Sequence, residues 1–200
     1  MSDYVFLFDL DATITRVEIL PELSRELGMY DKMRDLTEKT MRGEIPFRDS
    51  FLERVNLLKN LPISQVADFV ENIPLNDKLA DFIMNNNERC YIVTGNLDVW
   101  IQRLMIKLKV SNHVFCSTTS HKEDKLLKVN SVIDKAKVIE QFISPVVAVG
   151  DGSNDSEMIG MAQIGIGYGG VRPVAYSTLC NSKFAIYEEG KLCQFLQRLL

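Results

Sequence analysis

The sequence predicts an α/β fold, a doubly wound Rossmann-like parallel sheet with a small inserted α-helical cap. Short apolar runs of strand length alternate with helical patterns over most of the chain, as in parallel sheets that helices cover on both faces. Two of these runs end in carboxylates. The segment 15–76, directly after the first run, carries helix signals but no convincing strand. Together these features indicate a layered core with a helical insertion.

The first expected strand is the apolar run at residues 4–8, which is followed by Asp9 and Asp11. Because side chains alternate along a strand, we expect the two carboxylates to point the same way from its end. Unpaired buried charges are costly, so the pair does not suit a core. Such carboxylates can hold a hard cation such as Mg²⁺, while one acts as nucleophile and the other moves protons. The alternative is a strand end with solvated acids and a Thr cap.

The later strands are expected at five further apolar runs. Leucine and isoleucine recur at helical spacing after the first of these, and another helical pattern precedes the third. In such sheets, ligands bind beyond the carboxyl ends of the strands, where Asp9 and Asp11 fall. The five runs are residues 90–93, 114–116, 146–149, 164–166 and 184–187.

Proline and glycine mark four expected helices in the insertion. Pro21 opens a helix that Gly28 closes, and a second helix spans about residues 30–42. Pro46 opens a third helix, and Ser64 caps a fourth. Helices in this position would cover the strand ends, and their closure would exclude bulk water from phosphoryl chemistry.

The expected organisation is a core domain, residues 1–14 and 77–200, with the cap at residues 15–76. The 200 residues are 46% hydrophobic with a net charge of −4, which suits a sizeable core and gives no basic surface for nucleic acid. No apolar stretch has the length of a membrane span or a signal peptide. The four cysteines lie in or beside apolar runs and form no C-x-x-C pair, so we expect free, buried thiols in a reducing, cytoplasmic setting rather than a zinc site. No motif indicates an oligomeric state.

Two motifs between the acidic strand ends add groups that could bind phosphate. Thr94 and Gly95 end the second apolar run, and a hydroxyl with nearby N–H groups can hold a phosphate oxygen. A simple helix cap is the alternative. Lys135 opens a helix against its macrodipole, which indicates an anionic partner, either a phosphate or the Asp9 carboxylate, although a solvated lysine is also compatible.

A second acidic strand end follows the run at residues 146–149. Asp151 and Asp155 lie here with two glycines, which let the backbone bend close to a ligand. A turn could use the same residue types. Considered with the first acidic pair, the threonine and the lysine, however, this motif completes a set that could serve one phosphoryl group.

The order D-L-D-A-T, V-T-G-N, K-A-K-V-I and G-D-G-S-N-D resembles the haloacid dehalogenase superfamily of phosphatases. The helical insertion resembles the small-cap branch of that superfamily that contains phosphoserine phosphatase. The resemblance covers nearly the whole chain. It selects Lys135 rather than Lys137 as the site lysine, so we expect Lys137 to face solvent.

The resemblance implies a role for each motif residue. Asp9 would attack phosphorus and become an aspartyl phosphate, while Asp11 would protonate the leaving alkoxide and then activate water. Mg²⁺ would be held by the Asp9 carboxylate, the Asp11 backbone carbonyl and Asp151. Thr94 and Lys135 would hold the phosphoryl oxygens.

The other implied site residues surround this centre. Asp155 would orient the metal shell, and Asn154 would reach the phosphate or the substrate. In the cap, Glu18 would meet a substrate ammonium and Arg54 a substrate carboxylate. The remaining substrate-binding residues are Met41 and Phe47, as an apolar wall, with Gly95 and Asn96.

Two departures from the family pattern bear on the substrate. Asn96 stands where the family usually has a second glycine, and a bulkier side chain there could narrow or re-aim the pocket. The segment 122–134 is shorter than usual, which could change the sheet edge near Lys135.

The expected function is a Mg²⁺-dependent phosphomonoesterase with O-phosphoserine as favoured substrate, and with neither nucleic acid nor membrane as partner. A phosphatase or phosphotransferase for another small phosphorylated amino acid or metabolite is the alternative, because both would share the aspartyl-phosphate half-reaction. A receiver-type signalling domain fits poorly, since its nucleophile lies apart from the acidic pair and it lacks a cap. A non-catalytic binding module fits poorly as well, since every catalytic residue type is present.

Overall fold

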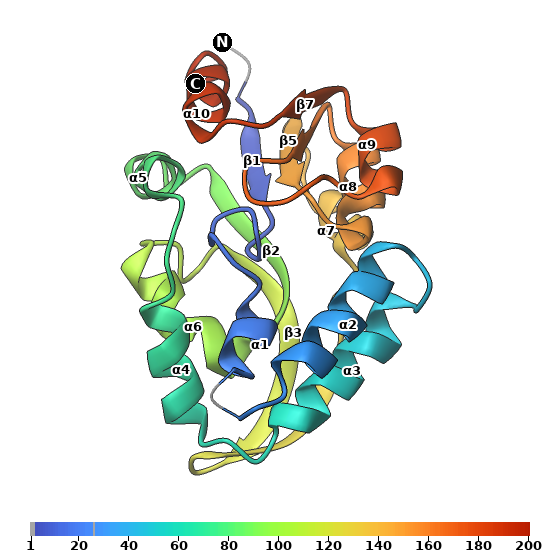
Figure 1. Ribbon diagram of the computed structural model, residues 1–200. Helices are drawn as coiled ribbons and strands as arrows, with labels where there is room; N and C mark the ends of the chain where they lie inside the picture. The colour runs from blue at the N-terminus through green and yellow to red at the C-terminus, as the bar shows by residue number, and fades with distance from the viewer. Residues whose placement is uncertain (1–2, 26) are drawn as a thin grey trace.

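The computed structural model describes residues 3–25 and 27–200. In these residues seven strands form one sheet in the order β4-β3-β2-β1-β5-β6-β7 (Figure 1). All neighbouring strands are parallel except β3 and β4, so the predicted doubly wound sheet is confirmed. The strands are β1 (Val5–Phe8), β2 (Cys90–Leu97), β3 (Val114–Lys122), β4 (Lys125–Ser131), β5 (Val146–Gly150), β6 (Ile164–Tyr168) and β7 (Phe184–Ile186).

The central strand β1 sets the position of the site. Phe8, its last residue, pairs with Ile92 of β2 on one side and Val149 of β5 on the other. The end of β1 is therefore level with Ile92 and Val149. The residues that follow these three positions lie close together at the same edge of the sheet. Strands buried on both faces are expected to be continuously apolar, which is why the sequence revealed β1 and β5 so clearly.

The antiparallel hairpin β3–β4 was not predicted. β3 continues to Lys122, well past the expected run at residues 114–116, and β4 occupies a segment for which no strand was expected. Most residues of β4 are exposed. A strand at a sheet edge needs no continuous apolar run, so the usual sequence signal for a buried strand is missing.

Helices cover both faces of the sheet. Phe6 and Phe8 point into a large core on one face, and Leu7 points into a smaller core on the other, as strand alternation requires. Helices α5 and α6 lie on the first face and α7 and α8 on the second (Figure 1). The helices of the sheet layers are α5 (Asp77–Asn85), α6 (Asp98–Lys107), α7 (Lys135–Ile139), α8 (Ser156–Met161), α9 (Tyr176–Asn181) and α10 (Glu189–Gln197).

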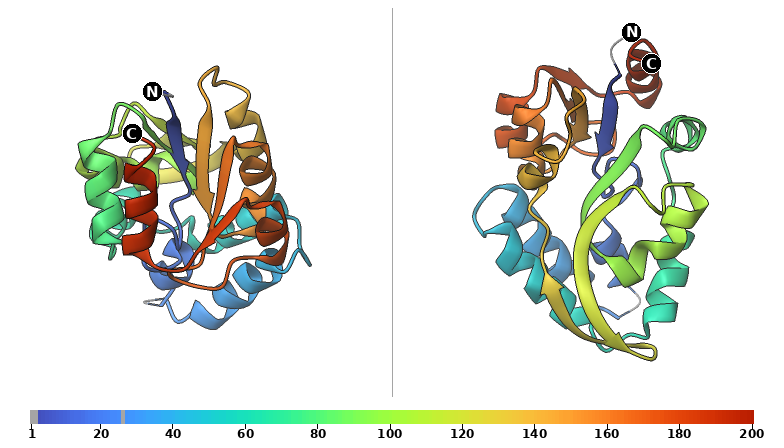
Figure 2. Two further views of the ribbon diagram at one scale, coloured as in Figure 1. Left: turned by 90° about the horizontal axis from the view of Figure 1, so that it is seen from above. Right: turned by 180° about the vertical axis from the view of Figure 1, so that it is seen from behind.

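Four helices separate β1 from α5 in the chain. Helices α1 to α3 lie beyond the carboxyl end of β1, as Figure 1 and the right-hand view of Figure 2 both show. Helix α4 lies alongside α6. The second helix follows its predicted bounds closely, and the third begins directly after Pro46, as predicted. The four are α1 (Ile19–Leu23), α2 (Tyr30–Met41), α3 (Phe47–Leu58) and α4 (Ile63–Glu71).

Two predicted helix boundaries in this segment were wrong. Helix α1 begins two residues before Pro21 and ends well before Gly28; Pro21 still occupies the first turn, where its missing N–H costs nothing. Ser64 is not the cap of α4, because Pro62 holds that position. Instead, Asp124 in the β3–β4 turn accepts hydrogen bonds from the Ser64 N–H at 2.7 Å and its hydroxyl at 2.6 Å. The β3–β4 hairpin thus holds the first turn of α4 through Asp124.

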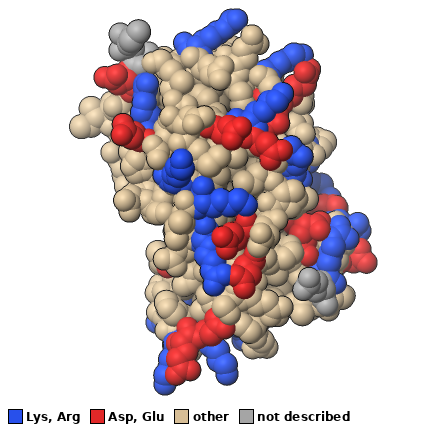
Figure 3. Space-filling view, turned by 90° about the vertical axis from the view of Figure 1, so that its left-hand side faces the viewer, with Lys and Arg blue, Asp and Glu red and all other residues tan. Residues whose placement is uncertain are grey.

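The charged surface is mixed where the figures show it. On the face that carries α4, α5 and α6, acidic and basic side chains are interspersed (Figure 3). In the described part of the chain, no helix combines the length and apolar character needed to cross a membrane.

Candidate active site

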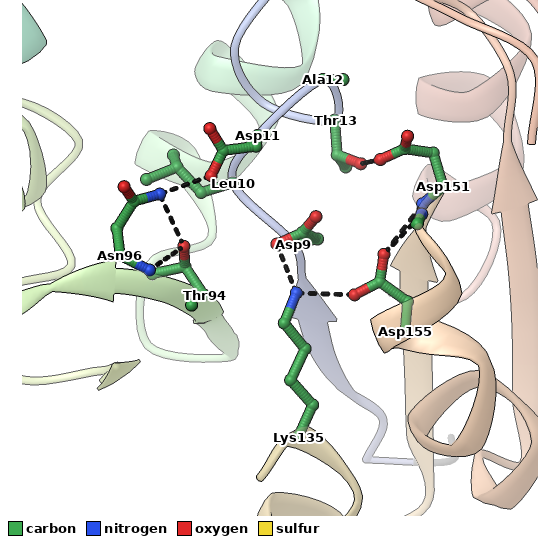
Figure 4. A network of polar contacts seen from close by, with 12 residues as sticks. Asp9, Leu10, Asp11, Ala12, Thr13, Thr94, Asn96, Lys135, Asp151 and Asp155 are labelled. Carbon is green, nitrogen blue, oxygen red and sulfur yellow. Dashed lines mark hydrogen bonds and ion pairs between the residues drawn. The ribbon is translucent and has the colours of Figure 1, made fainter. Parts of the chain in front are cut away.

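A buried ion-pair network joins the ends of β1 and β5. Asp9 follows β1, and its Oδ1 lies 2.5 Å from the Nζ of Lys135, the first residue of α7 (Figure 4). The same Nζ lies 2.6 Å from Oδ1 of Asp155. Of the two anionic partners left open for Lys135, the structure therefore shows the Asp9 carboxylate. Burial alone would lower the pKa of Lys135, but Asp155 and Asp9 outweigh it and raise that pKa above its ordinary value.

Lys137 has a different environment. Its side chain is 75% exposed and pairs with Asp134 at 3.3 Å. The prediction that Lys137 faces solvent is therefore confirmed.

Asp155 holds the β5 loop in shape. It is fully buried, and its Oδ2 accepts the N–H groups of Asp151 at 3.1 Å and Gly152 at 2.8 Å. A Cβ at position 150 would lie 2.6 Å from this carboxyl group. The loop can therefore wrap around Asp155 only because residue 150 is glycine. Since Lys135 takes the other oxygen, both carboxylate oxygens of Asp155 are in use.

Three buried carboxylates could hold a metal ion. One oxygen from each of Asp9, Asp151 and Asp155 lies within 4.8 Å of the others. Burial raises the pKa of Asp151 to about 7, and burial followed by the Asp155 charge raises that of Asp9. Three carboxylates buried together form a donor set that fits a hard divalent cation. Such a cation would favour their ionised forms.

Asp11 points elsewhere than expected. The strand ends at Phe8, and the chain then turns through Ala12 at a φ of 52°, so the alternation rule for strands does not reach Asp11. Its carboxylate instead accepts the N–H of Ile19 at 2.8 Å and a hydrogen bond from the Asn96 side chain (Figure 4). Asp9 and Asp11 nevertheless line one cavity. Burial, followed by the Glu18 charge, raises the pKa of Asp11 to about 6.

Asn96 links Asp11 to Thr94. Thr94 is fully buried, and its hydroxyl oxygen lies 3.1 Å from both the backbone N and the Nδ2 of Asn96. The strand continues past Thr94 to Leu97, farther than the apolar run suggested. Gly95 between them leaves room for Phe47 of α3, because a Cβ there would overlap the phenyl ring.

The predicted substrate-binding residues share this cavity. Arg54 on α3 is 5% exposed and donates from Nη1 to the Thr37 hydroxyl at 3.1 Å and from Nε to the Ser50 carbonyl at 3.4 Å. In residues 3–25 and 27–200, no carboxylate lies in ion-pair contact with this guanidinium. The others that line the cavity are Glu18, Met41, Phe47, Gly95, Asn96 and Asn154.

Arg172, which was not predicted, also lines the cavity. It lies in the loop after β6, with Nη1 2.5 Å from Oε1 of Glu18 and Nε donating to Asp151. Its Nη2 lies 3.4 Å from the Met41 sulfur. The run at residues 164–166 was identified as a strand, so the same strand-end rule that revealed Asp9 could have revealed Arg172.

The fold and site define a doubly wound α/β protein with buried acids and a lysine at the strand ends, beneath inserted helices. Residues 6–159 match the family model of haloacid dehalogenase-like hydrolases. The chain belongs to this family, in its phosphoserine phosphatase-like branch.

Two curated relatives show the extent of the likeness. The chain is 33% identical over 179 residues to a phosphoserine phosphatase of Archaeoglobus fulgidus, covering 82% of this chain and 52% of that protein. It is 30% identical over 179 residues to the phosphoserine phosphatase of Methanocaldococcus jannaschii, covering 82% and 84%. The chain therefore spans about half of the first relative and most of the second.

Solved structures share the fold. A phospho-aspartyl intermediate analogue of phosphoserine phosphatase superposes with a TM-score of 0.78 at 24% identity, covering 95% of this chain and 97% of that one. A substrate-bound phosphoserine phosphatase complex superposes with a TM-score of 0.80 at 24% identity, covering 98% of each.

Proposed function

We infer that this protein is a Mg²⁺-dependent phosphomonoester hydrolase that acts through an aspartyl phosphate, with O-phosphoserine as its substrate. One observation carries the inference. The Asp9 carboxylate is buried at the end of β1 with one oxygen bonded to Lys135, inside a group of three acids whose oxygens lie within 4.8 Å of one another. A structural core would not collect these charges at such cost, whereas phosphoryl transfer needs all of them.

Asp9 is the nucleophile in this proposal. Its carboxylate attacks phosphorus, the bond to the serine oxygen breaks, and water later hydrolyses the aspartyl phosphate. Lys135 stays bonded to the other oxygen of Asp9 and neutralises charge that develops on the phosphoryl group, to which the Thr94 hydroxyl adds a donor.

Asp11 is the general acid and base. A pKa of about 6 lets the carboxyl give a proton to the leaving alkoxide and take one from water near neutral pH. The Ile19 N–H at 2.8 Å and the Asn96 amide hold its orientation.

The acids suit Mg²⁺, whose bound charge would neutralise the phosphoryl oxygens. Asp9 and Asp151 would hold it with the backbone carbonyl of Asp11. Asp155 binds Lys135 through one oxygen and the N–H groups of Asp151 and Gly152 through the other, so we assign it to positioning Lys135 and the Asp151 loop. Phosphoserine phosphatases, to which the chain is similar, belong to a generally metal-dependent class, which supports this assignment.

The cavity suits an amino-acid head group. Arg54 is a buried cation without a carboxylate partner among the described residues, so it would bind the substrate carboxylate. Glu18 would accept the ammonium, Met41 and Phe47 would form the apolar wall, and Asn154 would lie toward the phosphate. The names of the relatives, phosphoserine phosphatases, agree with this head group.

We propose residues 15–76 as a cap that closes over this cavity. Phe47 packs against Gly95, and a Cβ at Gly152 would lie 2.7 Å from the Met41 methyl group, so the inserted helices touch the core backbone on both sides of the site. Such contacts would exclude water during phosphoryl transfer.

The four cysteines are free, which supports a reducing, cytoplasmic setting. Cys90 and Cys193 are buried and Cys116 is half-buried, but Cys180 is exposed, so the expected burial was wrong for Cys180.

Phosphate release from O-phospho-L-serine in the presence of Mg²⁺ tests the proposal, beside a panel of small phosphomonoesters. We expect phosphoserine to lead the panel and Asp9→Asn to abolish turnover of every ester. A chain without turnover of any ester would contradict the proposal. Transfer to an added alcohol in preference to water would identify a phosphotransferase instead.

A further inference from the structure

Arg172 places a fixed positive charge at the end of the cavity that would receive the substrate head. Its guanidinium bridges Glu18, at 2.5 Å from Oε1, and Asp151. The Arg172 and Glu18 side chains are only 25% and 20% exposed, so water screens this pair weakly. The loop itself is anchored, because the Ala175 N–H donates to the Asp151 carbonyl at 2.8 Å.

This contact changes what Glu18 can offer a ligand. A carboxylate that already pairs with a guanidinium attracts a second cation less strongly, and the two cations repel each other at short range. Arg54, a second guanidinium in the same cavity, has no carboxylate in ion-pair contact within residues 3–25 and 27–200. Glu18 thus shares the cavity with two guanidiniums, one of which is already paired with it, while Asp11 lines the same cavity.

We propose that Arg172 is a specificity-determining residue that weakens the requirement for a substrate amino group. The enzyme would then hydrolyse small phosphorylated hydroxy acids, which carry a carboxylate and no amine, alongside phosphoserine. The reaction is the same ester hydrolysis, with water consumed and phosphate and a hydroxy acid released. This proposal rests on the proposed function, since it concerns the head group that the same cavity reads.

The contact with Asp151 does not confuse the test. Loss of the Arg172–Asp151 contact would alter how Asp151 binds the metal. The rate of hydrolysis would then change equally for two esters that differ only in the amine. Only an effect at Glu18 would change the ratio between them. The ratio of kcat/KM for O-phospho-L-serine to that for 3-phosphooxypropionate, its analogue without the amine, therefore isolates the proposed role.

The experiment measures this ratio in the wild-type protein and in four variants. In Arg172→Gln, Glu18 loses its partner, and we expect the preference for the amine to rise about tenfold or more. Arg172→Lys, which is too short to keep both contacts, should give a smaller rise. Glu18→Gln should lower the ratio toward that of an enzyme that does not recognise the substrate amino group. Arg34→Gln, on the exposed side of α2, is the matched control and should leave the ratio unchanged.

The outcomes separate the two proposals. If neither ester is turned over by the wild-type protein, the proposed function is wrong. If both are turned over but the ratio stays within about twofold in Arg172→Gln and Arg172→Lys, Arg172 does not set specificity. Should Arg172→Gln fold but turn over too slowly, calorimetric titration of the metal-free protein with the two esters gives the same ratio as binding constants, with the same expected rise.

Discussion

Two regions of the proposed active site differ in how completely their charges are bonded. We call them the catalytic end (Asp9, Asp11, Lys135, Asp151 and Asp155) and the head-recognition end (Glu18, Arg54 and Arg172). At the catalytic end, Asp155 is fully buried and uses both oxygens, and Lys135 bridges two acids. At the head-recognition end, Arg54 has only neutral hydrogen-bond partners, and Glu18 and Arg172 remain partly exposed. The bonds of the first region fix a geometry for one reaction. In the second region the charge of Arg54 remains available to a ligand, whereas Glu18 is already paired with Arg172. The comparison predicts that changes at the catalytic end abolish chemistry and that changes at the other end redirect it.

Among variants that keep Asp9, the largest effect should follow Lys135→Met. Removing the lysine leaves Asp9 and Asp155 without their cation, so we expect kcat/KM to fall by about 10²–10³-fold for every ester, with about 3–5 kcal/mol of stability lost. Kinetics on the ester panel together with chemical denaturation would measure both. Lys137→Met is the matched control, because that exposed lysine should matter by less than about 0.5 kcal/mol. Equal behaviour of the two variants would break the comparison.

A change at Arg54 should be selective. With Arg54→Gln we expect kcat/KM for O-phospho-L-serine to fall on the order of 10²-fold, because the buried ion pair between Arg54 and the substrate carboxylate is lost. Phosphoethanolamine, which has no carboxylate, should change by less than about threefold. A uniform loss on both esters would assign Arg54 to structure rather than to recognition.

The catalytic end should also give the metal-free protein an unusual dependence on pH. The pKa values of Asp11 and Asp151 are raised to about 6 and about 7, so these groups stabilise the fold at low pH and that contribution is lost as pH rises through those values. We expect the melting temperature without metal to be a few degrees higher at pH 5 than at pH 8. Mg²⁺ should stabilise more at pH 8, because it binds the ionised acids.

Thermal melts at both pH values, with and without Mg²⁺, would check this. Asp151→Asn removes one of the titrating groups and should flatten the dependence in the metal-free protein. A metal-free protein that is more stable at pH 8 than at pH 5 would contradict the raised pKa values.

The smallest effect is expected at Asn96. Its side chain donates to Asp11, which favours the ionised carboxylate, so Asn96→Gly should raise the pKa of Asp11 and move the pH–rate profile upward by about half to one unit. The rate at the optimum should change only a few-fold. A downward shift in the profile would show that Asn96 acts on the substrate rather than on Asp11.

The catalytic end could be predicted from the sequence because each of its residues follows a buried parallel strand or opens a helix. Asp9 and Asp151 come directly after continuous apolar runs. The helix dipole indicated an anionic partner for Lys135, and the family resemblance then selected it over Lys137. Such local signals survive without knowledge of distant contacts. These signals did not predict the orientation of every side chain. Asp11 lies past the end of β1, where a turn sets the orientation of its carboxylate.

The rest depended on contacts between distant segments. The strand-end rule could have indicated Arg172 as a site residue, but no local signal predicts its pairing with Glu18, more than a hundred residues away in the chain. Asp124 fastens α4 from an exposed hairpin that lacks the apolar signal of a buried strand. Edge strands and cross-chain ion pairs are set by the tertiary fold, which local patterns do not encode.

The most direct test of the central claim is mass spectrometry of acid-quenched protein during turnover of O-phospho-L-serine with Mg²⁺. We predict one phosphoryl group on the peptide that contains Asp9, absent in Asp9→Asn and absent without substrate. Turnover without any such adduct, or an adduct on a different residue, would contradict the assignment of Asp9 as the nucleophile.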